Sequence, residues 1–292
     1  MVKASDIGRV IVGLAILAAI AGVILLRVVH APKTPRPRPE PVAEGCGGPG
    51  WEAAIKANTA SLDTLAWTPF GRAETGWATY APLVAHEAGT ACPPTTPGFA
   101  AALARWQARR RLPSDGVFRP EAFDAMRDAM NLRRPFVQAT ARGLCPAAPS
   151  ESALATVPPG EAFGDKPIQL RADALAAYHR MAAAARTAGV AGGEVLKVVS
   201  GYRGPAEEAA RCVDGSCNTL TRAHCSAHRT GLALDLFLDH LPGHDPTSTD
   251  DANRAAMAQS PAYRWLVRHA GDFGFLPYPY EPWHWEWTSA PP

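Results

Sequence analysis

The sequence predicts an α+β protein with a mostly antiparallel sheet, plus a small all-α N-terminal domain and a transmembrane helix. Three observations favour this class. A continuous apolar run lies near the N-terminus, two amphipathic helix patterns follow in the first half, and helix and strand patterns mix without regular βαβ alternation in the second half. With 292 residues, the chain is long enough for two modest cores.

The apolar run predicts a membrane anchor. Residues 10–26 read VIVGLAILAAIAGVILL, without a charge, between Arg9 and Arg27. This length is near the lower limit for a membrane-spanning helix. A cleaved signal peptide is the alternative, but its apolar segment is usually shorter. We therefore expect residues 1–30 to form an uncleaved single-pass anchor in the inner or cytoplasmic membrane, and the Pro-rich residues 31–45 to form an extended linker.

Charge and cysteine content exclude some classes of protein. A net charge of +2 without a basic stripe argues against a nucleic-acid partner. All six cysteines follow the apolar run, and an even number favours disulfides in an oxidising compartment. Pairing stays open, except that we expect two of Cys212, Cys217 and Cys225 to be joined. A structural zinc site at this cluster with His224 is the alternative, but its spacing fits no common zinc finger.

Residues 46–147 are expected to form the helical domain. The segment FAAALARWQARRRLPSDGVFRPEAFDAMRDAM, residues 99–130, predicts a helix, a turn at 113–116 and a second helix from about Pro120. The pattern resembles the small peptidoglycan-binding helical repeat of cell-wall hydrolases. The matching positions are Trp106-Gln107, Leu112-Pro113, Asp115-Gly116 and Pro120. An ordinary helical hairpin is the alternative interpretation.

Residues 148–292 are expected to form the α+β domain. Helix patterns occur at 171–189 and 260–275, and strand patterns at 194–203, 230–238 and 282–287.

Two polar clusters in this domain predict a metal site. Asp235 interrupts an apolar strand, where an unpaired carboxylate would be costly. His228 precedes it across a bend at Gly231, and His284 follows Glu281 by three residues near the end of the chain. Two imidazoles and one carboxylate are a typical ligand set for catalytic Zn²⁺, and a nearby carboxylate is a typical general base. The alternatives are that His and Asp residues lie near one another by chance and that the Trp-His-Trp segment is a structural core strand.

Three segments resemble the signature segments of the zinc D-alanyl-D-alanine carboxypeptidase family, which includes the VanY-type peptidases. They are SGYR at 200–203, SAHRTGLALD at 226–235 and EPWH at 281–284. The resemblance implies metal ligands, a base and substrate contacts. The implied zinc ligands are His228, Asp235 and His284, the catalytic base is Glu281, Arg203 holds negative charge on the substrate, and Ser226 contacts substrate.

The resemblance implies a zinc metallocarboxypeptidase that hydrolyses peptidoglycan stem peptides by removing the C-terminal D-alanine. The expected partners are peptidoglycan or its peptide precursors, and the membrane through the N-terminal helix, with the catalytic domain periplasmic or extracytoplasmic. The alternatives are an L,D-carboxypeptidase or endopeptidase on peptidoglycan, and a non-catalytic wall-binding protein. A thiol enzyme is disfavoured, because the sequence has no Cys-x-x-Cys motif.

Overall fold

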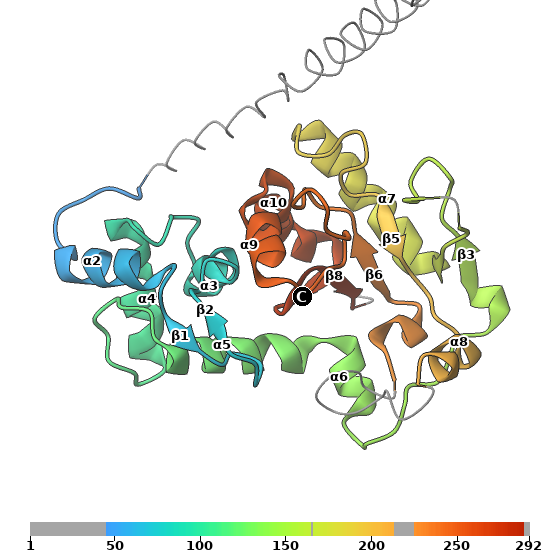
Figure 1. The fold of residues 1–292 in the computed structure, drawn as a ribbon, viewed down its shortest axis with the longest axis horizontal. Coiled ribbons are helices and arrows are strands. Elements are labelled where there is room, and N and C mark those ends of the chain that lie inside the picture. The colour runs from blue at the N-terminus through green and yellow to red at the C-terminus, as the bar shows by residue number, and fades with distance from the viewer. Residues whose placement is uncertain (1–44, 165, 213–224, 289–292) are drawn as a thin grey trace, which may run out of the picture. The chain divides into compact units, whose positions relative to one another are not determined.

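The computed structural model describes residues 45–164, 166–212 and 225–288. The described residues belong to one compact unit, Val42–Pro292 (Figure 1). The predicted anchor, residues 1–30, and nearly all of the predicted linker lie outside the described residues. Within the described ranges, no helix is long and apolar enough to cross a membrane.

The first part of the described chain is mainly helical. Its helices are α2 (Glu52–Ser61), α3 (Ala81–Ala88), α4 (Pro97–Arg109), α5 (Pro120–Arg133) and α6 (Pro135–Thr140). Helices α4 and α5 confirm the two helices expected from the sequence. Thr96 caps α4 by accepting a hydrogen bond from the Phe99 amide, and a proline begins each helix, where its missing N–H costs nothing.

The prediction that this part is all-α was wrong in one detail. Strands β1 (Ala66–Trp67) and β2 (Glu74–Thr75) form a small antiparallel pair between α2 and α3. Each strand has two residues, too few for an alternating apolar pattern to appear in the sequence. The pair is fixed instead by packing: the buried Trp67 ring contacts Tyr80 and Phe123 and donates its indole N–H to the Gly76 carbonyl.

The turn between α4 and α5 explains two positions of the repeat-like pattern. The Gln107 side chain accepts a hydrogen bond from the Gly116 amide and donates one to the Val117 carbonyl. Gly116 has φ +71°, and a Cβ there would lie 2.5 Å from the Ala100 carbonyl oxygen. Both residues therefore have a structural role in closing the turn.

The second part of the chain is an α+β domain. Its strands are β3 (Leu154–Thr156), β4 (Gln169–Arg171), β5 (Val198–Ser200), β6 (Ala233–Leu236), β7 (Phe275–Tyr278) and β8 (Glu281–Trp287). Its helices are α7 (Ala172–Thr187), α8 (Pro205–Ala210), α9 (Asp251–Gln259) and α10 (Pro261–His269), with the short 3-10 helices η1 (Glu151–Ala153), η3 (Ala227–Thr230) and η4 (Ala270–Phe273). Each helix and strand pattern expected here contains an element of the expected type. However, β5 and β6 are shorter than their patterns, and the helix pattern at 260–275 also covers η4 and the first residue of β7.

The main sheet is antiparallel throughout, as expected. Its order is β5-β6-β8-β7, so β8 from the end of the chain lies between β6 and β7. In Figure 1, β6 and β8 lie in the middle of this domain, with α9 and α10 on one side and α7 on the other. All four residues of β6 are buried, because both faces of the strand are covered. A polar side chain on β6 must therefore find its partners inside the protein.

The described cysteines are all in disulfides, which confirms the expectation of bridges. Cys46 pairs with Cys92 and Cys145 pairs with Cys225. Cys225 thus bonds to a residue 80 positions away rather than to a member of its own cluster. Cys212 is also disulfide-bonded. Cys217 lies outside the described residues, so the expected local bridge stays a prediction.

Two buried ion pairs join the helical part to the α+β domain. Arg134, between α5 and α6, pairs with Glu286 of β8. Arg254 of α9 pairs with Glu74 of β2 at 3.2 Å and is fully buried. Tyr80 of the helical part donates its hydroxyl hydrogen to the same Glu74 carboxylate. The predicted division at residues 147 and 148 stays a prediction, since both parts lie in one compact unit.

Candidate active site

His228 is held in place by the short helix η3. The Ser226 hydroxyl accepts a hydrogen bond from the His228 amide and caps the helix, and Gly231 ends it with φ +69°. The His228 Nδ1 atom lies 2.7 Å from the Gly201 carbonyl oxygen at the end of β5. This contact requires a proton on Nδ1, and it leaves Nε2 as the ring nitrogen that faces Asp235. The bend expected at Gly231 is confirmed.

Asp235 and His284 face each other across neighbouring strands. They are direct partners in the β6–β8 register. Asp235 Oδ1 lies 2.9 Å from His284 Nδ1, and Asp235 Oδ2 lies 3.2 Å from His228 Nε2. One carboxylate therefore contacts both imidazoles, and Asp235 and His284 meet although they are 49 residues apart in the sequence.

These three side chains fit a metal ion. All three are buried, and one donor atom from each lies within 4.8 Å of the others. Zn–N and Zn–O bonds are about 2.0–2.2 Å long, and three protein ligands with an open position are typical of catalytic zinc. The Gly201 carbonyl fixes the His228 tautomer that leaves Nε2 free for a metal. The cluster is thus a candidate metal centre built from the residues that the sequence indicated.

Asp235 and the two imidazoles lie close enough to shift pKa values within the cluster. Burial alone would raise the pKa of Asp235, but the two imidazoles outweigh it and hold this pKa well below its usual range. Burial lowers the pKa of His284, but its hydrogen bond to Asp235 and the nearby Glu286 carboxylate outweigh this effect and raise the pKa to about 9. In the metal-free site, therefore, His284 carries a proton at neutral pH that a metal ion must displace.

Glu281 begins β8, three residues before His284. It is only partly exposed. Burial raises the pKa of its carboxyl group, and the negative charge of Asp235 raises it further, while the imidazoles of His284 and His228 lower it. A carboxylate with a raised pKa beside a candidate metal centre has the properties of a general base.

Arg203 and Ser226 lie together at the edge of the cluster. Arg203 Nη1 donates to the Ser226 hydroxyl over 3.2 Å, and the Arg203 amide donates to the His228 carbonyl oxygen over 3.2 Å. Both side chains are only partly buried. A cation and a hydroxyl next to a metal centre can bind an anionic group of a ligand.

The carboxylate that positions Ser226 was not predicted from the sequence. Glu208 of α8 is buried, accepts the Ser226 amide hydrogen over 2.8 Å and pairs with Arg229 at 2.9 Å. No local pattern marks it, because the neighbouring Glu207 has the same side chain and is exposed.

Glu286 was not predicted as a site residue either. It is buried, and its Oε1 atom lies 3.6 Å from His284 Nε2. Because alternate residues of a strand point to the same face, Glu286 is expected on the face of His284 once β8 is known to be a strand. The WHWEW pattern therefore contained the signal.

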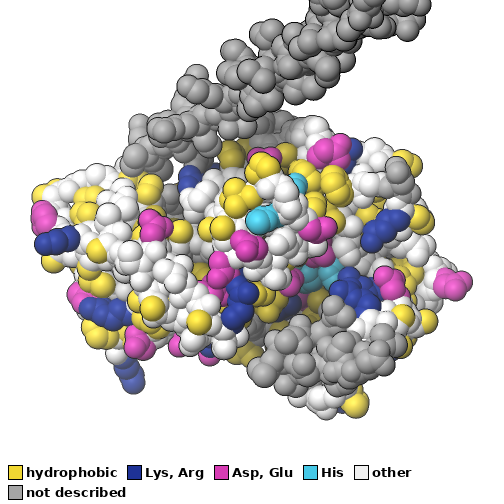
Figure 2. Space-filling model, in the orientation of Figure 1, with side chains coloured by type: hydrophobic (Ala, Val, Ile, Leu, Met, Phe, Trp, Pro, Cys, Tyr) yellow, Lys and Arg dark blue, Asp and Glu magenta, His cyan; other side chains and the backbone are white. Residues whose placement is uncertain are grey.

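The remaining histidines near the site do not join the cluster. His240 lies 3.2 Å from the Leu238 carbonyl oxygen, and His244 lies 3.9 Å from Asp250. His224 lies outside the described residues. Figure 2 shows histidine side chains near the middle of the visible face, with basic and acidic side chains beside them.

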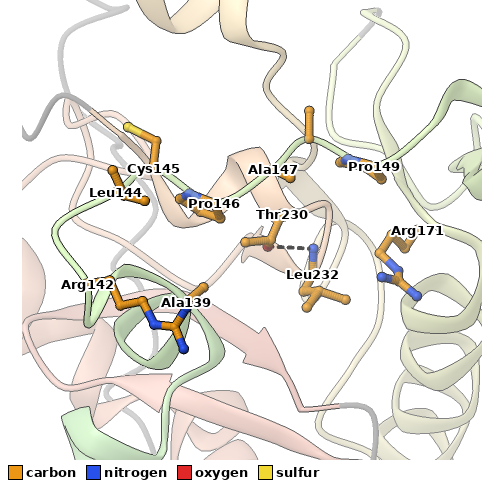
Figure 3. A pocket seen from close by; sticks show the side chains of 11 residues that line it. Ala139, Arg142, Leu144, Cys145, Pro146, Ala147, Pro149, Arg171, Thr230 and Leu232 are labelled. Carbon is orange, nitrogen blue, oxygen red and sulfur yellow. Dashed lines mark hydrogen bonds between the residues drawn. The ribbon is translucent and has the colours of Figure 1, made fainter.

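A separate pocket lies beside the end of η3 (Figure 3). It is lined by Ala139 of α6, by Arg142 and residues 144–149 of the segment after α6, and by Arg171, Thr230 and Leu232. None of the six predicted site residues lines it. The pocket therefore borders the segment that presents His228 without being part of the metal cluster.

Comparison with protein families decides the assignment of the α+β domain. Residues 167–290 match the family described as VanY, D-alanyl-D-alanine carboxypeptidase. These residues form a VanY domain. The match includes the whole four-stranded sheet and all six predicted site residues, and it confirms the resemblance seen in the sequence.

Two solved structures are similar to this chain. One is the LdcB LD-carboxypeptidase, with 23% sequence identity and a TM-score of 0.36 over 48% of this chain and 69% of that chain. The other is a mutant of the vancomycin resistance D,D-pentapeptidase VanY from a VanB-type cassette in complex with Zn(II), with 19% identity and a TM-score of 0.29 over 49% of this chain and 83% of that chain. No curated protein sequence matches this chain.

Proposed function

We propose that this protein is a zinc-dependent peptidase that hydrolyses peptidoglycan stem peptides and removes their C-terminal D-alanine. The observation that supports this most directly is the convergence of His228, Asp235 and His284, with donor atoms within 4.8 Å, inside a VanY domain. The proposed zinc ligands are these three residues. Zn²⁺ bound there would act as a Lewis acid on water and on the scissile carbonyl.

The Glu281 carboxylate is the proposed general base. It would accept a proton from the attacking water and return it to the nitrogen of the leaving D-alanine. A base works best when its pKa approaches the working pH, and burial raises the pKa of Glu281 in this direction.

Arg203 and Ser226 are the proposed substrate contacts. The Arg203 guanidinium would bind the terminal carboxylate of the stem peptide or the negative charge that develops on the carbonyl oxygen. Its hydrogen bond to Ser226 Oγ, and the Glu208 carboxylate behind the Ser226 amide, hold both groups in one orientation.

The proposed location is outside the cytoplasm, attached to the membrane through residues 10–26. The disulfides Cys46–Cys92 and Cys145–Cys225 support an oxidising compartment. In this arrangement the helical part, with its resemblance to a peptidoglycan-binding repeat, would contact the cell wall near the substrate.

The proposal is tested with residues 42–292 and a pentapeptide that ends in D-Ala-D-Ala. With Zn²⁺ we expect release of one D-alanine, detected by mass spectrometry, and loss of this activity after treatment with a chelator. Glu281→Gln should lower kcat by about 10²–10⁴-fold, as expected for loss of a general base. The control is Glu207→Gln, which removes an exposed carboxylate near Arg203 and should leave kcat unchanged.

The products separate the alternatives. Release of D-alanine from a tetrapeptide but not from the pentapeptide would identify an L,D-carboxypeptidase, and cleavage of cross-linked dimers would identify an endopeptidase. Zinc binding without hydrolysis of any of these substrates would contradict a peptidase and favour a wall-binding protein.

A further inference from the structure

The second nitrogen of His284 has an unusual environment. Its Nδ1 atom faces Asp235 and the other donor atoms, so the opposite atom, Nε2, must hold the ring proton when Nδ1 binds a metal. Nε2 is buried and has no hydrogen-bond partner among the described residues. A buried N–H group without an acceptor is costly, and metal-bound histidines almost always donate this hydrogen to a carboxylate or a carbonyl.

Glu286 is the carboxylate positioned to accept it. Its Oε1 atom lies 3.6 Å from His284 Nε2, just beyond hydrogen-bond length, and the two side chains are 2% and 5% exposed. Both project from the same face of β8, since they are two residues apart in a strand. A small rotation of either side chain would complete the hydrogen bond.

Glu286 is itself held from outside the VanY domain. Arg134 donates through Nε to Oε1 over 2.6 Å, and its Nη2 atom lies 2.5 Å from the same oxygen. The Phe136 amide donates to the second carboxylate oxygen, Oε2, over 2.9 Å. Arg134 and Phe136 lie at the junction of α5 and α6, before the residues that match the family.

We propose that Arg134 and Glu286 are positioning residues for His284, so that the helical part of the chain completes the metal site of the VanY domain. The contacts form a connected series. The Arg134 guanidinium and the Phe136 amide fix the Glu286 carboxylate, and this carboxylate orients the imidazole of His284. This inference rests on the proposed function only in taking His284 as a metal ligand. It does not depend on which peptide bond is cleaved.

The competing explanation is that Arg134 and Glu286 only stabilise the fold. A second ion pair in the protein serves as the comparison for this explanation. Arg254 and Glu74 also join the helical part to the VanY domain, and both are buried. Their polar contacts are with Tyr80, Asp251, the Tyr280 carbonyl and one another, and none is with the three candidate ligands. Breaking this pair should cost stability without changing metal affinity.

The experiment measures Zn²⁺ affinity by competition with a chromophoric chelator, without any substrate. Arg134→Met should weaken Zn²⁺ binding by about 10–100-fold, which is the usual effect of losing an outer partner of a metal ligand. Arg134→Lys retains the charge but not the fork, so its affinity should fall between Arg134→Met and the unmodified protein. The control Glu74→Gln should lower the melting temperature and leave the Zn²⁺ affinity unchanged.

A second variant distinguishes loss of the positioning contact from loss of the fold. Arg134→Met alone leaves a buried carboxylate without its cation, whereas Arg134→Met combined with Glu286→Gln leaves no unpaired charge. The double variant should recover stability but retain the weakened Zn²⁺ affinity. With Co²⁺ as a spectroscopic probe, its visible absorption bands should differ from those of the unmodified protein, because the orientation of His284 has changed.

The outcomes separate this inference from the proposed function. Unchanged Zn²⁺ affinity and unchanged Co²⁺ spectra in the folded double variant would overturn the positioning role, whatever the enzyme hydrolyses. Weakened binding in a protein that cleaves no peptide would support the positioning role and contradict the peptidase. In an active enzyme, kcat should fall by about 10–100-fold while KM changes little, since the substrate contacts are untouched.

Discussion

At the residue scale, the two histidines of the site are held in different ways. His228 has a backbone carbonyl, that of Gly201, at its second nitrogen, whereas His284 has the Glu286 carboxylate near its second nitrogen. A carbonyl fixes the tautomer without adding charge. A carboxylate favours the protonated ring, and hydrogen bonding to carboxylates is what raises the pKa of His284 above its ordinary value.

The metal-free protein should therefore lose stability in mildly alkaline solution. The pKa of His284 is about 9 in the folded protein, above its ordinary value of 6.5. A raised folded-state pKa gives stability that is fully present below pH 6.5 and is lost as the pH rises through 9. The expected loss is about 3 kcal/mol in the free energy of unfolding.

The measurement is urea unfolding at pH 6 and pH 9.5 in the presence of a chelator. His284→Gln is the control, because this variant lacks the titrating group and should show a smaller difference between the two pH values. Saturating Zn²⁺ should abolish the loss, since a metal-bound imidazole carries no displaceable proton in this range. Equal chelator curves at both pH values would show that His284 is not protonated in the metal-free fold.

At the element scale, the local segments of the site were predictable and the distant partners were not. The motifs at 200–203, 226–235 and 281–284 contain all six predicted residues, and each is a continuous run of sequence. The site residues of these motifs come together because β8 lies between β6 and β7 in the sheet. No local sequence pattern predicts this strand order. The Cys145–Cys225 bridge and the hairpin of β1 and β2 were missed for the same reason: packing between distant segments, rather than local periodicity, determines them.

Gly201, directly after strand β5, supplies the carbonyl that orients His228. Gly201 has no room for a side chain, because a Cβ there would lie 2.3 Å from the Gln169 carbonyl oxygen. Gly201→Ala should push β5 away from β4 and displace the carbonyl that orients His228. We expect a loss of about 1–3 kcal/mol in stability, as for other overpacked sites, together with weaker Zn²⁺ binding.

The neighbouring glycine is a matched control. A Cβ at Gly204, in the same loop, would meet only the Tyr202 side chain at 3.5 Å, an ordinary contact. Gly204→Ala should leave the melting temperature and the Zn²⁺ affinity close to those of the unmodified protein. If the two variants behaved alike, the close approach of Gly201 to β4 would not be what positions His228.

At the scale of the whole molecule, the helical part and the VanY domain share one buried interface. Arg134 and Glu74 come from the helical part, and their partners Glu286 and Arg254 come from the VanY domain. The two parts were predicted as separate domains with separate functions. These ion pairs could not be predicted from the sequence, because Arg134 and Glu286 are 152 residues apart and no local pattern in either segment indicates a contact with the other.

The VanY domain should therefore depend on the helical part for its fold. A fragment of residues 148–292 would remove Arg134, the partner of Glu286, and Glu74, the buried partner of Arg254. Removing one partner of a buried ion pair typically costs about 3–5 kcal/mol, and this fragment loses two such partners. We expect the fragment to be unfolded or aggregated and to bind Zn²⁺ far more weakly than residues 42–292.

The fragment of residues 148–292 lacks Cys145, the disulfide partner of Cys225. Cys225→Ser is therefore introduced into the fragment. The matched control is residues 42–292 with both Cys145→Ser and Cys225→Ser. Circular dichroism during heating and chelator competition for Zn²⁺ are measured on both proteins. A cooperative transition of the fragment at the temperature of its control, with equal Zn²⁺ affinity, would show that the VanY domain is autonomous. A fragment that folds only when residues 42–147 are added as a separate chain would show that this interface supplies the missing stability.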